Sequence, residues 1–448
     1  MNDESSDFAL EPTDIPDHER EAILQSLQAG LVPRRGLHHI QVGRAREVKA
    51  VTEDIERVAN GGSAVRFIIG EYGSGKTFFL NLSRTIALEK GLVTAHADLT
   101  PERRLRSTSG HGQALYQALA RNLSTRASPT GGALRSIVER FIAEANREAQ
   151  NRDIPTEEVI REYLDDLSEL VGGYGFTDVI SAYWRGYQEA DDELQQAALR
   201  WLRGEYGTKT EARKDLGTRV PIIDDSNWYD MTKLLARFVN LAGYEGLLVN
   251  LDEMVNLYKL SHTVAREGNY ETLLSIVNDG IQGQAVGLGY FFAGTPKFLT
   301  DTKRGLYSYE ALRSRLAESS FASEDIVDLS GPVIRLTSLT QEDMFVLLQN
   351  LRHVHAGGTP TEYQVPDEAL EAFMKHCYDQ IGAEYFQTPR NTVKEFVSLL
   401  SILEQNPQLT WRDLLNEIEV ESESKNELTV EDTDLPESEE DEFADFEF

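Results

Sequence analysis

Five short and predominantly apolar segments dominate the hydrophobic pattern of the chain. They cover residues 64–70, 92–99, 244–253, 287–294 and 332–339. Nearly continuous apolar runs of this length are typical of parallel strands that are buried on both faces. Amphipathic stretches lie between them, the first at residues 77–90. This alternation predicts an α/β fold with a five-stranded parallel sheet.

Helical periodicity fills two long stretches outside the predicted strands. Between the second and third strands we expect helices at residues 111–124, 132–149, 156–170, 176–203 and 228–242. Aromatic residues at helical spacing are expected to form the core of this insertion, namely Tyr174, Phe176, Tyr183, Trp184 and Trp201. We divide the chain into an acidic arm and helix (1–30), the first part of the core (31–107), a helical insertion (108–243), the second part of the core (244–339), a helical lid (340–420) and a disordered acidic tail (421–448).

A glycine-rich loop joins the first predicted strand to the next helix. Residues 70–77 read Gly-Glu-Tyr-Gly-Ser-Gly-Lys-Thr and match the phosphate-loop pattern G-x-x-x-x-G-K-[ST] in full. Its glycines let backbone N–H groups surround phosphates, and the helix presents its N-terminus to the anion. Lys76 would bridge the β- and γ-phosphates of ATP, and the Thr77 hydroxyl would bind Mg²⁺. The nucleotide-binding residues predicted here are Gly70, Tyr72, Gly73, Ser74, Gly75, Lys76, Thr77 and Phe78.

Two carboxylates follow the third predicted strand. Residues 247–253 read Leu-Leu-Val-Asn-Leu-Asp-Glu, an apolar run that ends in Asp252 and Glu253. A solvated strand end gives the same pattern, but behind a complete phosphate loop we interpret the pair as functional. Asp252 would hold Mg²⁺, through water or through Thr77, and Glu253 would deprotonate the attacking water. The second carboxylate favours a hydrolysing ATPase over a nucleotide kinase.

Three residues near the last two strands are candidates for coupling hydrolysis to conformation. Thr295 follows the fourth strand and either occupies the sensor-1 position of AAA+ ATPases or caps the next helix. Arg313 and Arg315 precede the fifth strand, where AAA+ arginine fingers reach the nucleotide of a neighbouring subunit. Arginines at i and i+2 point to different sides of a helix, so one of them is structural. We prefer Arg315 as the finger, which implies a homo-oligomer.

Two further motifs flank the core. Val42, Gly43 and Arg44 resemble the Gly-Arg box that lines the adenine pocket of origin-recognition and STAND ATPases. Arg390 follows Thr388 and Pro389, which we expect at the N-cap and first position of a lid helix. Arg390 matches the sensor-2 arginine that reaches the γ-phosphate across the cleft.

Charge is the unusual feature of the composition. The chain has 75 acidic and 44 basic residues and a net charge of −31; residues 427–448 contribute 11 acidic residues, which leaves −20 elsewhere. An acidic surface with few lysines is typical of proteins that work at high salt, so we predict a halophilic host. In molar salt the negative charge does not exclude DNA. Five arginines are candidates for contacts with double-stranded DNA, or else for salt bridges to the acidic body: Arg34, Arg35, Arg103, Arg104 and Arg106.

The remaining composition excludes several classes of protein. No apolar run approaches the ~18 residues that a membrane span needs, and the acidic N-terminus lacks the apolar segment of a secretory signal. The single cysteine, Cys377, excludes a disulfide framework and a cysteine-rich zinc site. We therefore expect a cytoplasmic protein without membrane contact.

Several stretches together resemble one family. They are LVPRRGLHHIQVGR, FIIGEYGSGKTFFL, ADLTPERRLRSTSGHGQALYQALARNLST, LDEMVNLYKL, FFAGTPKFL, GLYSYEALRSRLA and TPRNTVKEF. The chain is similar, from about residue 25 to 415, to BREX-system ATP-binding proteins of the BrxD type. This resemblance implies an origin-recognition-like AAA+ core, phage defence, possible DNA engagement, and association with an Lhr-like superfamily-2 helicase and other BREX components. The acidic body and tail depart from the usual member.

We predict an AAA+ ATPase that binds ATP and Mg²⁺ and acts as a switch or loader in BREX defence. A STAND-like signalling ATPase, whose ATP-driven oligomerisation controls a protein partner without DNA, is the alternative. Such proteins usually carry a long sensor region and a fused effector, and neither is visible in the sequence. A scaffold that keeps ATP without hydrolysis is a third reading, against which the intact Asp252-Glu253 pair argues.

Overall fold

The predicted apolar segments form one parallel sheet in the computed structural model, which describes residues 12–318, 328–415 and 417–420. Its strands are β1 (Ser63–Gly70), β2 (Val93–Asp98), β3 (Leu247–Asp252), β4 (Leu288–Gly294) and β5 (Val333–Leu336). They lie in the order β2-β3-β4-β1-β5. The predicted five-stranded parallel sheet is confirmed, although β5 is shorter than the sequence suggested.

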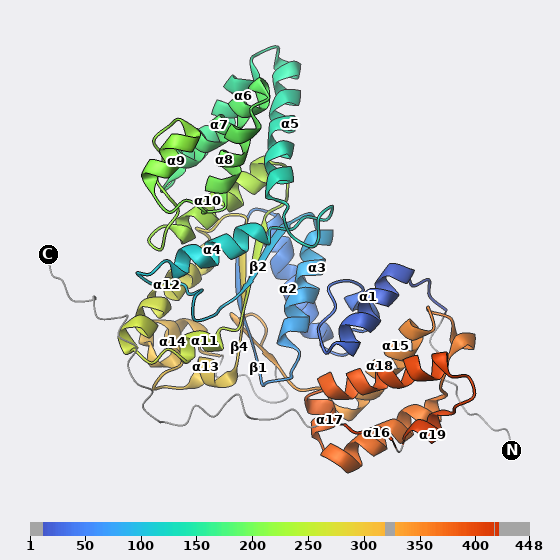
Figure 1. Cartoon of the computed structure of the whole chain (residues 1–448). Coiled ribbons are helices and arrows are strands. Elements are labelled where there is room, and N and C mark those ends of the chain that lie inside the picture. The colour runs from blue at the N-terminus through green and yellow to red at the C-terminus, as the bar shows by residue number, and fades with distance from the viewer. Residues whose placement is uncertain (1–11, 319–327, 416, 421–448) are drawn as a thin grey trace.

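The sheet is covered on both faces, which explains why its strands are almost wholly apolar. Helices α2 (Ala45–Ala59) and α3 (Lys76–Glu89) pack on one face, and α4 (His111–Arg121) and α12 (Thr263–Ile281) lie on the other (Figure 1). Successive residues of β1 alternate between the two layers: Phe67 and Ile69 join the cluster beneath α12, and Ile68 joins the cluster beneath α2. Each strand is thus buried on both sides.

The strand order brings the functional segments to one edge. Because all pairs are parallel, every strand ends at the same edge of the sheet. Strand β1 lies second from one edge of the sheet, and β2 lies at the opposite edge, so that β3 and β4 return towards β1 and β5 is added on its other side. The direction of winding therefore changes next to β1. Ligands of open α/β sheets bind at such a switch point. Short helices follow the strand ends there: α11 (Val255–Tyr258), α13 (Pro296–Thr300), η2 (Leu306–Ser308) and α14 (Glu310–Leu316).

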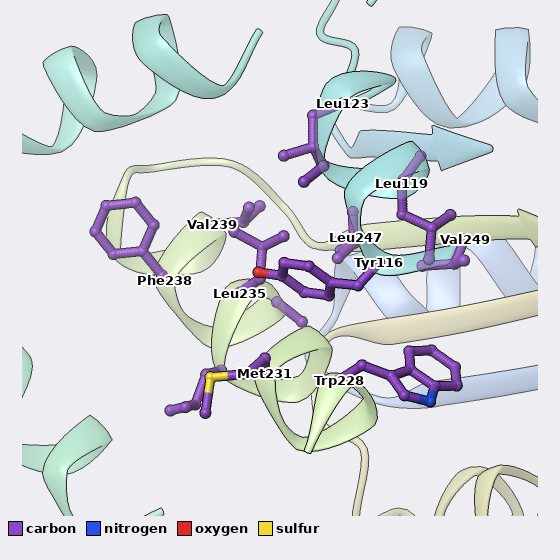
Figure 2. Packing of buried hydrophobic residues seen from close by; sticks show 14 of the residues in the cluster. Tyr116, Leu119, Leu123, Trp228, Met231, Leu235, Phe238, Val239, Leu247 and Val249 are labelled. Atoms are coloured by element: carbon purple, nitrogen blue, oxygen red, sulfur yellow. The ribbon is translucent and has the colours of Figure 1, made fainter. Parts of the chain in front are cut away.

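Helices fill the stretch between β2 and β3. Beyond α4 they are α5 (Leu134–Arg152), α6 (Thr156–Ser168), α7 (Gly173–Glu189), α8 (Asp192–Leu202), α9 (Lys209–Leu216) and α10 (Trp228–Leu241). Tyr116 of α4, Trp228 and Phe238 of α10, and Leu247 and Val249 of β3 belong to one cluster of buried residues (Figure 2). These helices therefore share a continuous hydrophobic core with the sheet.

The details of this helical region differ from the sequence expectation in three places. The single helix expected at 176–203 is wrong: the chain turns at Ala190, which has φ +54°, and α8 restarts behind Asp191, whose side chain accepts a hydrogen bond from Leu194 N–H. Helix α9 was missed, although Gly217 ends it and a Thr caps its start. Tyr174 is 76% exposed instead of lying in the core, whereas the other four aromatic residues are buried.

The C-terminal helices form a second hydrophobic cluster that includes the N-terminal helix. They are α15 (Gln341–His355), η3 (Pro360–Glu362), α16 (Asp367–Ile381), α17 (Glu384–Gln387), α18 (Arg390–Gln405) and α19 (Trp411–Leu415). Helix α1 (Asp17–Gln28) lies along α15 and α18 (Figure 1), and its Ile23 is buried among lid residues such as Leu348 and Phe396. Helix α1 thus packs with the lid and not on the sheet.

Three further sequence expectations bear on this description. Cys377 is buried in the lid, as its apolar surroundings require, and burial raises the pKa of its thiol to about 12. No helix within the described ranges is both long and apolar enough to cross a membrane. The predicted acidic tail at 421–448 and residues 1–11 of the arm lie outside the described residues.

Candidate nucleotide-binding site

A cavity of about 710 Å³ lies at the carboxyl edge of the sheet, between the core and the lid. The phosphate loop forms its floor, residues 30–32, 34, 40–42 and 44 form one wall, and α18 contributes from the lid. Most predicted site residues line it: Val42, Arg44, Tyr72, Gly73, Ser74, Gly75, Lys76, Thr77, Phe78, Asp252, Glu253, Thr295 and Arg390. Gly43, Gly70 and Arg315 lie outside its lining.

The phosphate loop has the backbone that its glycines permit. Gly73 and Gly75 have φ values of +78° and +79°, which other residues rarely adopt. Gly75 caps α3, so the N-terminus of this helix opens into the cavity. A Cβ atom on Gly70 would lie 2.9 Å from the Leu336 carbonyl oxygen, which only glycine tolerates. The loop is therefore held directly against β5.

Lys76 lies within the curve of the loop. Its Nζ donates hydrogen bonds to the carbonyl oxygens of Gly70, at 3.0 Å, and Glu71, at 2.9 Å. Burial lowers the pKa of Lys76, and the neighbouring carboxylates, Asp252 first among them, oppose this shift. An ammonium group in this position has the charge and reach to contact phosphates bound by the loop.

Thr77 and Asp252 are in direct contact. Thr77 Oγ1 donates a hydrogen bond to Asp252 Oδ2 at 2.7 Å, and Asp252 Oδ1 accepts one from the Glu253 N–H at 2.8 Å. Asp252 is 9% exposed, and the next residue, Glu253, turns away from the strand with φ +57°. A hydroxyl and carboxylates are hard oxygen ligands of the type that Mg²⁺ prefers, so these residues fit a magnesium ion.

A third carboxylate belongs to this cluster and was missed in the sequence. Asp98 ends β2 directly opposite Asp252 in the parallel register, and it lines the cavity. Burial and the charge of Asp252 raise the pKa of Asp98. Burial, followed by the charges of Asp252 and Asp98, likewise raises the pKa of Glu253. An acidic residue at the end of the second predicted strand was the available signal.

Arg44 joins the phosphate loop to the start of the lid. It has a left-handed backbone with φ +57°, and its guanidinium donates hydrogen bonds to the carbonyl oxygens of Ser74 and, at 3.2 Å, Thr337. Burial lowers the pKa of Arg44. Next to it, a Cβ atom on Gly43 would lie 3.0 Å from Asp343 Oδ1, in the first turn of α15. Contact with adenine by Val42, Gly43 and Arg44 stays a prediction.

Thr295 occupies the cavity edge and also caps a helix. Its Oγ1 accepts a hydrogen bond from the Phe298 N–H at 3.4 Å, which starts α13 behind β4. Thr295 therefore caps α13, which is one of the two roles expected for it. The sensor role stays a prediction for a residue that lines the cavity.

The start of α18 touches the phosphate loop, but not with the predicted cap. Pro389 is the N-cap of α18, whereas Thr388 is the C-cap of α17, and its hydroxyl donates to the carbonyl oxygen of Glu384, the first residue of α17, at 3.0 Å. Thr388 as N-cap was therefore wrong, because α17 ends too close to α18. A Cβ atom on Gly73 would lie 2.7 Å from Thr388 Cγ2, so loop and lid are in contact. Arg390 lines the cavity beside Gly30.

The two finger candidates lie outside the cavity of their own chain. Arg315 donates hydrogen bonds to the Asn278 side chain and, at 2.7 Å, to the Ala311 carbonyl oxygen. Arg313 is 55% exposed and lies 3.8 Å from Glu310. Arg315 is thus held within its own chain more firmly than Arg313, and the choice between them stays a prediction.

The arginines proposed for DNA contacts occupy different environments. Arg34 lines the cavity. Burial lowers the pKa of His96 to about 4, and the positive charges of Arg84 and Arg34 contribute to this shift. Arg35 is exposed, and Arg103 and Arg104 are half-buried. Arg106 forms a salt bridge with Glu271 at 2.5 Å, as expected if it pairs with the acidic body of the protein and not with DNA.

Comparison with protein families gives a match over most of the chain. A family model described as BREX system ATP-binding protein BrxC/D matches residues 15–419. A comparison with curated proteins found no match. The matched range includes the phosphate loop, all five strands and the lid.

Replacing Lys76 by Ala is expected to lower ATP affinity at least ~100-fold, because each hydrogen bond to a charged group contributes about 1.5–3 kcal/mol. Isothermal titration of the full chain with ATP measures this change. Lys90→Ala is the matched control, since Lys90 lies at the other end of α3 and pairs with Glu56 at 2.7 Å. Unchanged ATP binding in Lys76→Ala would overturn the phosphate-loop assignment.

Proposed function

The chain belongs to the family of BREX system ATP-binding proteins BrxC/D, and from this premise we propose that it is an AAA+ ATPase of the BrxD type. It hydrolyses ATP and acts as a switch or loader in prokaryotic antiphage defence. The observation that carries this proposal is the 2.7 Å contact between Thr77 and Asp252, with Glu253 beside it at the cavity edge.

The arrangement of these residues supports hydrolysis rather than ATP binding alone. Thr77 and Asp252 would hold Mg²⁺, which neutralises phosphate charge when bound. Lys76 would contact the β- and γ-phosphates from the loop floor, and Glu253 would accept the proton of the attacking water. Burial and neighbouring negative charges raise the pKa of Glu253, which strengthens it as a base.

Contacts between loop and lid support a coupling of nucleotide state to conformation. Thr388 of the lid lies against Gly73, and Arg44 connects Ser74 to the residues that lead into α15. Phosphates bound by the loop would face Arg390 from the lid and Thr295 from β4. A change from ATP to ADP would alter these contacts and thereby the position of the lid. Such a response is what a switch or loader requires.

The partners follow from the family and from surface charge. Other BREX components are the first candidates, and we include an Lhr-like superfamily-2 helicase and double-stranded DNA among them. Arg103 and Arg104 follow β2 and lie close in sequence to the cavity residue Asp98. One of the two arginines before β5, the exposed Arg313 or the half-buried Arg315, would complete the site of a neighbouring subunit in a homo-oligomer. We place the protein in the cytoplasm of a halophilic host.

Glu253→Gln is expected to keep ATP affinity close to wild type and to lower hydrolysis by a factor of ~10²–10⁴, the contribution of a general base. Phosphate release and ATP titration measure the two effects separately. Glu245→Gln, at an exposed position just before β3, is the matched control. Wild-type turnover in Glu253→Gln would remove this residue as the base.

The rate of hydrolysis is expected to fall as pH falls through the raised pKa of Glu253, because only the ionised carboxylate accepts a proton. Asp98→Asn removes a negative charge that raises this pKa. The pKa of Glu253 is then lower, so the acid limb of the pH–rate profile moves to lower pH. Glu102→Gln, four residues later and exposed, should leave the limb in place. If the acid limb of the pH–rate profile stays in place in Asp98→Asn, Glu253 is not the base whose ionisation sets that limb.

DNA is expected to stimulate hydrolysis, and a double variant, Arg103→Ser with Arg104→Ser, should reduce this stimulation. Phosphate release with and without duplex DNA across a salt series up to molar KCl measures it. Arg161→Ser on α6 is the control, because Arg161 is exposed and pairs only at 3.4 Å with Glu157 of its own helix. Absence of stimulation at every salt concentration would favour a switch that acts on protein partners alone.

A further inference from the structure

A second cluster of ligating side chains lies between α1 and η1 (Leu37–His39), apart from the magnesium-type site. It consists of Glu19 on α1 and His38 and His39 on η1, which we call the Glu-His-His cluster. His39 Nε2 lies 2.9 Å from Glu19 Oε2, and the rings of His38 and His39 have centroids 3.9 Å apart at 41°. One ligand atom from each residue lies within 4.8 Å of the others.

The backbone beneath this cluster is fixed by close packing. Gly36 caps η1 with φ +68°, and a Cβ atom there would lie 2.7 Å from Ile23 Cδ1 and 3.3 Å from Glu19 Cβ. Leu37 and Ile40, on either side of the histidines, are 1% and 4% exposed. The turn is therefore held directly against α1. The packing of Gly36, Leu37 and Ile40 keeps the two histidines next to Glu19. Ligands on a rigid backbone are a requirement for a metal site.

We propose that the Glu-His-His cluster binds a divalent transition-metal ion, with zinc as the best fit. Two imidazoles and one carboxylate suit zinc, whereas magnesium and calcium prefer oxygen ligands alone. Zinc–ligand distances near 2.1 Å place tetrahedral ligand atoms about 3.4 Å apart. His39 and Glu19 are already in contact, the ligand atom of His38 lies within 4.8 Å of both, and His38 is exposed, so a rotation of its side chain would bring the three ligands together. The three protein ligands leave a fourth position for water.

The position of the cluster gives the ion a consequence for the cavity. The cluster joins α1, which packs with the lid, to the turn η1, which packs on α3 behind the phosphate loop. Residues on both sides of η1 line the cavity, among them Val32 and Val42. A bound ion would therefore fix one wall of the cavity and join it to the lid. We expect metal binding to raise the melting temperature of the full chain.

Titration of the full chain with Co²⁺ as a spectroscopic probe for zinc tests the proposal. Excess Mg²⁺ is present so that the carboxylates Asp98, Asp252 and Glu253 are occupied. We expect one Co²⁺ per chain with the intense visible absorption of a tetrahedral ion, displaced by Zn²⁺. Glu19→Gln, His38→Asn and His39→Asn should each weaken binding at least ~10-fold. His18→Asn, at an exposed position directly before Glu19, should bind as wild type.

His38→Asn is the decisive variant, because His38 is exposed and its loss leaves the hydrophobic packing intact. The melting temperature of the metal-free protein shows that each variant folds. Absence of Co²⁺ binding at micromolar concentrations overturns the proposal. Binding that survives in His38→Asn but is lost in Asp252→Asn also overturns it, because the ion then occupies the magnesium-type site. Loss of ATP binding in Lys76→Ala leaves this proposal unaffected, since Lys76 is not part of the cluster.

Discussion

The parallel alignment of the strand ends is the constraint on which the candidate site depends. Because β1 and β3 end at the same edge, Thr77, which follows β1, reaches Asp252 on β3 at 2.7 Å. The hydrogen bond spans β4, which lies between the two strands in the sheet. Packing on both faces of the sheet holds the strand ends in place. Helix α3 supplies Lys76 and Thr77 from its first turn, whereas α2 and α12 support the sheet without contributing side chains to this chemistry.

The sequence predicted those parts of the molecule that depend on local pattern. Continuous apolar runs located the strands, and the glycine-rich loop located the floor of the cavity. Asp98 escaped detection because its place beside Asp252 exists only in the folded register of β2 and β3. Thr388 was assigned to the wrong helix end, because its hydroxyl has two candidate partners and the sequence does not tell which one is nearer. Tertiary contacts decided both cases.

Charge in this protein is organised by pairing and burial more than by its net value of −31. Arg106 forms a salt bridge with Glu271. Arg44 donates hydrogen bonds to the backbone carbonyl oxygens of Ser74 and Thr337. Arg34 lies in the cavity wall near the carboxylate cluster instead of on a separate basic patch. Exposed pairs weaken at high salt, but buried contacts are screened much less. The hydrogen bonds of the half-buried Arg44 are therefore screened less than the exposed pair of Arg106 and Glu271.

The shared cluster of α1 and the lid has a mechanical consequence. Ile23 of α1 and Phe396 of α18 belong to one hydrophobic core, although 373 positions separate them in the sequence. The N-terminal helix and the lid are therefore one packing unit, which the segment 29–44 and the connection around Thr337 join to the sheet. Both the wall that the segment 30–34 forms and the wall that α18 forms are attached to this unit. A displacement of the unit relative to the sheet would therefore change both walls of the cavity together.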